Sequence, residues 1–82
     1  MPTVLRLGSL RVAVYPNDHR PAHVHVIGHG HEGVFTLTGP AGFVALRENY
    51  GFSARDLASI RIVLEENIAA LASAWERIHG NR

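Results

Sequence analysis

The stretch SARDLASIRIVLEENIAALASAWERIH, residues 53–79, carries the strongest structural pattern in this sequence. Its large apolar residues follow one another at intervals of three or four positions, which places their side chains on one face of an α-helix. These residues are Leu57, Ile60, Leu64, Ile68, Leu71, Trp75 and Ile78. The pattern therefore predicts one long amphipathic helix near the C-terminal end of the chain.

Both ends of this stretch carry residues that are typical of helix termini. Ser53 is a suitable N-cap, and Asp56, three positions later, is a weaker form of the acid in a capping box. Gly80 stands where a glycine commonly ends a helix. The opposite face is charged and is expected to face water; it carries Arg55, Arg61, Glu65, Glu66, Glu76 and Arg77.

The residues before the helix contain short runs in which apolar residues alternate with others, the pattern of half-buried strands. These runs are residues 4–7, 11–15, 22–27, 34–38 and 43–46. Glycine, proline and asparagine residues separate them and predict turns at residues 8–9, 16–18, 28–33 and 39–42. The first two runs are expected to form a hairpin, and residues 47–53 are expected to form a loop that leads into the helix.

Together these elements predict an α+β fold, in which a small antiparallel sheet of three to five strands packs against one long C-terminal helix. The 82 residues have room for a single domain, with the sheet in residues 1–46 and the helix in residues 53–79. Val24 and Val26 are expected to face the helix together with Val12 and Val14. By alternation, His23 and His25 should then lie on an uncovered face of the sheet.

The composition excludes several classes of protein. The chain contains no cysteine, so disulfides and thiolate–zinc sites are excluded. It has no apolar run of about 18 residues, so nothing in it is expected to span a membrane. Its N-terminal residues lack the layout of a signal peptide, so we expect a cytoplasmic protein. The net charge of +1 is too small to indicate nucleic-acid binding by itself.

The segment NDHRPAHVHV, residues 17–26, contains three of the six histidines and is the main candidate for a functional site. One interpretation is structural, with His23 and His25 simply occupying outward strand positions. A second is a metal site: the two imidazoles would lie on one face, about 6.5–7 Å apart at the backbone. His19 or Glu32 could then complete a three-ligand shell for zinc or nickel. The neighbouring turn with His29 and His31 is interpreted as solvated.

A third interpretation is metal-independent catalysis by a ribonuclease, which needs only an acid/base pair and a cation because RNA supplies its own 2′-hydroxyl nucleophile. His23 and His25 would form that pair, Asp18 would orient a histidine, and His19 and Arg20 would contact phosphate. No cofactor is expected in this case. The sequence has no lysine, no cysteine and no nucleophile motif, which argues against acyl transfer and nucleotide hydrolysis.

A fourth interpretation is recognition without chemistry. Arg11 and Tyr15 would join the two strand histidines on the open sheet face and present it to a partner. Tyrosine and histidine stack on bases, and arginine binds phosphate, so single-stranded RNA would suit this surface. The same groups also suit a protein interface.

Three segments together resemble the small bacterial proteins grouped as domain of unknown function 4160. They are the opening MPTVLRLGSLRVAVYPNDHRPAHVHV, the helix entry NYGFSARDL and the ending LEENIAALASAWERIHG. The typical family motif has two prolines before His-Val-His, whereas Ala22 replaces the second one here. The matching motif positions are Asn17, Asp18, His19, Pro21, His23 and His25.

The resemblance implies a bacterial cytoplasmic protein with a small protein partner from a neighbouring gene. Family members are suspected components of toxin–antitoxin systems, and some carry the label of transcriptional regulator. The favoured hypothesis is therefore a toxin–antitoxin-type protein that binds or cleaves nucleic acid, most readily RNA. The alternatives are a non-enzymatic antitoxin or regulatory module, with a homodimer as one form of association, and a metal-binding protein that uses His19, His23 and His25.

Overall fold

The computed structural model describes residues 3–37 and 44–80, which form one antiparallel sheet and two helices. The five strands follow the order β1-β2-β3-β4-β5, so each strand pairs with its neighbours in sequence. The strands are β1 (Thr3–Leu7), β2 (Leu10–Ala13), β3 (His23–Gly28), β4 (His31–Thr36) and β5 (Ala45–Tyr50). The helices are α1 (Ala54–Glu66) and α2 (Ile68–His79). The expected α+β fold is confirmed.

Two tight turns connect the strands of the first and third hairpins. Gly8, with φ of 61°, lies in the turn between β1 and β2. His29 and Gly30, with φ of 55° and 76°, form the turn between β3 and β4, and type I′ hairpin turns require positive φ at both central positions. The expected hairpin of the first two strands is confirmed. The turn expected at residues 28–33 is shorter, because β3 continues to Gly28 and β4 already begins at His31.

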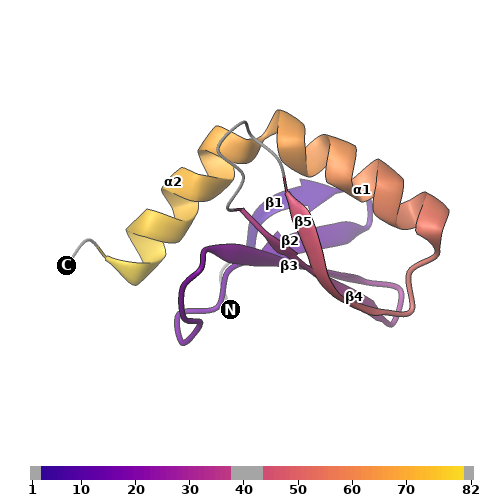
Figure 1. The fold of residues 1–82 in the computed structure, drawn as a ribbon, viewed down its shortest axis with the longest axis horizontal. Helices are drawn as coiled ribbons and strands as arrows, with labels where there is room; N and C mark the ends of the chain where they lie inside the picture. The colour runs from indigo at the N-terminus through magenta and orange to yellow at the C-terminus, as the bar shows by residue number, and fades with distance from the viewer. Residues whose placement is uncertain (1–2, 38–43, 81–82) are drawn as a thin grey trace.

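One face of the sheet and both helices enclose the hydrophobic core. α1 lies along this face, and α2 continues past the strands toward the C-terminus (Figure 1). The buried residues of this core are Val12, Val14, Val24, Val26, Phe35, Val44, Phe52, Ile60, Leu64, Leu71 and Trp75. The inward orientation expected for Val12, Val14, Val24 and Val26 is therefore confirmed.

The expected single helix is divided in two at Asn67. The side chain of Asn67 donates to the carbonyl oxygen of Val63 (2.8 Å), and its backbone N–H donates to that of Leu64 (3.1 Å). These bonds end α1, because asparagine readily exchanges helical hydrogen bonds for side-chain ones. The apolar stripe nevertheless continues across the break to Leu71. Neither helix in the described part of the chain is long and apolar enough to cross a membrane.

The start of α1 agrees with the sequence. The hydroxyl oxygen of Ser53 accepts a hydrogen bond from the backbone N–H of Asp56 at 3.1 Å, so Ser53 is the N-cap.

The bounds of the last strand differ from those expected from the sequence. This strand was expected at residues 43–46 with a loop after it, but β5 extends to Tyr50 and leaves only three residues before α1. The sheet therefore runs past the boundary expected at residue 46, and the first expected residue, Phe43, lies outside the described residues.

The packing of α1 on the sheet generates a stability prediction. Leu64 is 0% exposed and belongs to the core, whereas Ile62, two positions earlier, is 58% exposed. Leu64→Ala should lower the free energy of unfolding by about 2–5 kcal/mol, because it leaves a cavity between α1 and the sheet. Ile62→Ala is the matched control and should change it by about 0.5 kcal/mol or less. Equal effects of both substitutions in urea unfolding would contradict the packing.

Candidate functional site

The two histidines of β3 lie on the face of the sheet opposite its valines, as expected. Cross-strand pairing places His25 in one row with Ala13 and Val34, while Val24 and Val26 belong to the core on the other face. The expectation that this histidine face is uncovered is wrong. His23 is only 5% exposed.

The cover comes from the segment between β2 and β3, residues 14–22, which folds back over the histidines. The ring of Tyr15 stacks on that of His25, with centroids 4.1 Å apart. The backbone N–H of Asp18 donates to the carbonyl oxygen of Tyr15 (3.0 Å), which forms a turn that directs the Asp18 side chain toward β3. Alternation along the strand predicted the correct face, but it could not predict that another segment covers it.

Asp18, His23 and His25 form the central cluster of this site. The Oδ2 atom of Asp18 lies 3.1 Å from Nε2 of His23 and 3.0 Å from Nε2 of His25. The two imidazole centroids are 5.3 Å apart, and one candidate ligand atom from each of the three residues lies within 4.8 Å of the others. The cluster joins residues from a loop and a strand. Within residues 3–37 and 44–80 it is the one such group of three or more histidine and carboxylate ligands.

The other ring nitrogen of each histidine also contacts an acceptor. Nδ1 of His23 donates to the carbonyl oxygen of Pro21 (2.8 Å), and Nδ1 of His25 donates to Oε2 of Glu32 (2.8 Å). A neutral imidazole has one N–H, so once Nδ1 donates, Nε2 offers a lone pair. A lone pair that points at a carboxylate is unfavourable. A cation between Nε2 and Asp18, or a proton on one of these groups, would relieve this contact.

The loop that carries Asp18 is also attached to α2. The guanidinium of Arg20 donates to both carboxylate oxygens of Glu76, at 3.1 and 3.2 Å. The ring of His23 lies 5.2 Å from that of Trp75, centroid to centroid. The backbone N–H of Leu37 donates to the carbonyl oxygen of Ala22 (2.8 Å), which extends the pairing of β3 with β4. The site is therefore held from the sheet on one side and from α2 on the other.

The cluster opens into a small pocket of about 290 Å³. His19 and Arg20, which were expected to contact phosphate, are exposed and line this pocket, but His19 takes no part in the cluster. Asp18, and not His19, turns toward β3 and lies with the two strand histidines. Arg47 and Glu48 also line the pocket, and no sequence pattern indicates them, because residues 47–53 are expected to form a loop.

The remaining expected residues, Arg11 and Tyr15, lie beside the cluster. Arg11 belongs to β2 and pairs with Ile27 in the sheet. Burial is the main cause that raises the pKa of the Tyr15 phenol, and the Glu32 carboxylate raises it further, while Arg11 acts in the opposite direction. Tyr15 is therefore an uncharged hydroxyl at neutral pH, packed on one of the histidines. Glu32, considered above as a ligand, instead orients His25 through Nδ1.

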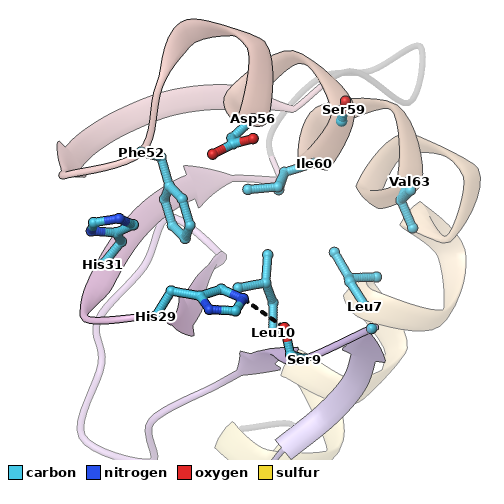
Figure 2. A pocket seen from close by; sticks show the side chains of 11 residues that line it. Leu7, Ser9, Leu10, His29, His31, Phe52, Asp56, Ser59, Ile60 and Val63 are labelled. Carbon is cyan, nitrogen blue, oxygen red and sulfur yellow. Dashed lines mark hydrogen bonds between the residues drawn. The ribbon is translucent and has the colours of Figure 1, made fainter.

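A larger cavity of about 520 Å³ lies at the other end of the sheet, between the two hairpin turns and α1 (Figure 2). Apolar side chains such as Leu10 and Ile60 form most of its walls. Its polar groups stand on different walls: His29 bonds Ser9 (Nε2–Oγ 2.6 Å) on the turn side, and Asp56 lies on α1. Because these groups do not converge, the smaller pocket is the better candidate for chemistry.

A family model described as "Domain of unknown function (DUF4160)" matches residues 10–76. The match covers all of the site and most of the fold, so this chain belongs to that family. No curated protein and no solved structure has significant similarity to the chain. The family match agrees with the resemblance seen in the sequence, but it assigns no reaction to the chain.

The burial of His23 generates a second prediction. His23→Ala removes two hydrogen-bond contacts and the packing on Trp75, so it should lower the free energy of unfolding by about 1–3 kcal/mol. His19→Ala is the matched control, since His19 is exposed, and should change the value by about 0.5 kcal/mol or less. Urea unfolding of both variants measures this difference. If His23→Ala were as stable as wild type, the buried position of the ring would be wrong.

Proposed function

We propose that this chain is a metal-binding protein, in which Asp18, His23 and His25 hold one divalent transition-metal ion. One observation carries the proposal: a carboxylate oxygen from a loop and two imidazole Nε2 atoms from a strand converge on one point. Nδ1 of each imidazole is at the same time held by a protein oxygen. Histidine ligands of metals usually donate their second ring N–H to a carboxylate or carbonyl in this way.

The distances suit a metal with short bonds. Ligand atoms of a tetrahedral zinc ion, bound at about 2.0–2.1 Å, lie about 3.3 Å from one another. The Oδ2 atom of Asp18 is already 3.1 and 3.0 Å from the two Nε2 atoms, so the remaining adjustment is mainly between the two rings. Two nitrogens and one oxygen, without sulfur, suit zinc, nickel, cobalt or ferrous iron.

Three protein ligands would leave at least one coordination position open. Structural zinc sites generally use four protein ligands, whereas catalytic sites keep a position for water or substrate. The cluster faces a pocket and not a closed interior, so the open position would be accessible to a small ligand. A bound ion would supply Lewis-acid chemistry or an activated water at this position.

Titration of untagged, metal-free protein with Zn²⁺, Ni²⁺ or Co²⁺ tests the metal proposal. Calorimetry should give one equivalent bound. Trp75 is the single tryptophan and lies 5.2 Å from His23 between ring centroids, so Ni²⁺ or Co²⁺ should quench its fluorescence at the same stoichiometry. His25→Gln and Asp18→Asn should each weaken binding by about ten-fold or more, because each removes one ligand.

His19→Gln is the matched control for this titration, since it removes an exposed imidazole from the mouth of the same pocket. It should leave the metal affinity unchanged. Circular dichroism of each variant establishes that it is folded. A folded wild-type protein that binds no metal, or equal losses from His19→Gln and His25→Gln, would reject the site.

RNA binding is a second candidate function. The observation in its favour is that His19, Arg20 and Arg47 line the pocket mouth, where they could contact phosphates. Metal-independent cleavage is less favoured, because both acid/base histidines contact one carboxylate oxygen and are not placed on two sides of a substrate. RNA binding that weakens with salt and with Arg20→Gln would support this candidate; the absence of binding at low salt would reject it.

We also propose a small protein partner encoded by a neighbouring gene, in a bacterial cytoplasm and as part of a toxin–antitoxin pair. This part of the proposal depends on the resemblance to the family and not on the geometry of the site. Co-expression with the neighbouring gene product, followed by size-exclusion chromatography, tests it. Two separate peaks would reject the partner, and a larger species of this chain alone would indicate a homodimer.

A further inference from the structure

A β-bulge in β5 points to an additional ligand contact at the proposed metal centre. Phe35 pairs with Leu46 and Val34 pairs with Glu48, so Arg47 is an extra residue without an opposite partner on β4. Bulges of this kind occur next to active sites, where they redirect a side chain. Arg47 lines the same pocket as the metal cluster, although it lies two strands away from it.

The two arginines that line this pocket, Arg20 and Arg47, differ in their hydrogen bonds. Arg20 is bound by both oxygens of the Glu76 carboxylate. Within the described residues, the guanidinium of Arg47 has neither a hydrogen bond nor an ion pair, and the residue is exposed. Arg47 therefore offers a planar set of donors to a ligand in the pocket, which is the arrangement that binds carboxylates and phosphates.

We infer that the metal centre takes a phosphate group as its ligand and that Arg47 holds this group from the β5 side. The inference rests on the proposed function, because the phosphate would occupy the open coordination position of the metal. One phosphate oxygen would bind the metal beside His25, and the oxygens that remain would accept hydrogen bonds from Arg47.

Phosphate fits this arrangement better than a carboxylate does. The backbones of β3 and β5 are separated by two strand spacings, or about 9–10 Å, and Val34 of β4 lies between them in the same row. The metal and the arginine would therefore approach the ligand from different sides. A tetrahedral phosphate has oxygens that diverge toward both, whereas a carboxylate has only two oxygens, which lie in one plane.

The charges around the pocket make phosphate binding depend on the metal. Asp18, Glu32 and Glu48 place carboxylates in or beside the pocket, and Glu48 accepts a hydrogen bond from the hydroxyl of Tyr50 at 3.0 Å. These groups repel an anion in the metal-free protein, where Arg47 is the one unengaged arginine of the pocket within the described residues. A bound divalent ion would offset this repulsion, because its two positive charges would lie next to the ligand.

Phosphate groups occur in small phosphate esters and in RNA, so the experiment uses both sources. The first step is the metal titration of untagged protein described above. In the second step, calorimetry measures the binding of phenyl phosphate and of acetate to zinc-loaded and to metal-free protein. Arg47→Gln is the test variant. Arg55→Gln is the matched control, because Arg55 is an exposed arginine of α1 outside the lining of this pocket.

Phenyl phosphate should bind the zinc-loaded protein with one equivalent and should not bind the metal-free protein. Arg47→Gln should weaken this binding by about ten-fold or more, because a charged hydrogen bond is lost, while the zinc affinity stays unchanged. Arg55→Gln should behave as wild type. Competition by single-stranded RNA that also depends on Arg47 would identify RNA as the source of the phosphate, and its absence would identify a small ester.

The outcomes separate the two proposals. If zinc binds but phenyl phosphate does not, the metal site stands and the phosphate inference is wrong. If none of Zn²⁺, Ni²⁺ and Co²⁺ binds, the proposed function fails in the first step, and the inference fails with it. Equal binding of acetate, binding to metal-free protein, or full affinity of Arg47→Gln would each overturn the inference while leaving the metal site intact.

Discussion

The contact of one Asp18 carboxylate oxygen with both imidazoles of β3 organises the part of the molecule outside the main core. It fixes the segment between β2 and β3 over the histidine face of the sheet, where Tyr15 then stacks on a ring. The same segment reaches α2 through Arg20 and Glu76. A chain without cysteine has no disulfide for this purpose. These polar contacts therefore attach the segment between β2 and β3 to the sheet and to α2, which the hydrophobic core already holds together.

A polar cluster of this kind is difficult to stabilise in a protein of only 82 residues. A domain of this size buries about 60–65% of its unfolded surface, so its stability is marginal. Ionisable groups withdrawn from water are destabilising unless their partners are complete, and an apolar cluster at the same place would be simpler. Residues that lower the stability of a fold are concentrated at functional sites. The cluster consists of such residues, and a bound cation would complete its pairing.

The sequence predicted what depends on local periodicity. The apolar stripe located the helical region, and alternation placed Val24 and Val26 in the core with His23 on the other face. It could not predict what depends on contacts between distant residues. Nothing local distinguishes Asp18 from His19 as the residue that turns toward the sheet. The break at Asn67 depends on its side-chain bond within α1, and the extension of β5 beyond residue 46 was not predicted because its bulge at Arg47 disrupts alternation.

The ligand set also determines how metal binding and folding would be related. Asp18 belongs to a loop, whereas both histidines belong to a central strand that pairs on each side. A loop ligand must be brought to the strand before the site exists, so part of the binding free energy would be used to order the loop. The bonds between Arg20 and Glu76 already hold that loop against α2. This exposed contact with α2 helps to place the segment that carries Asp18, so a smaller part of that segment would have to be ordered when a metal ion binds.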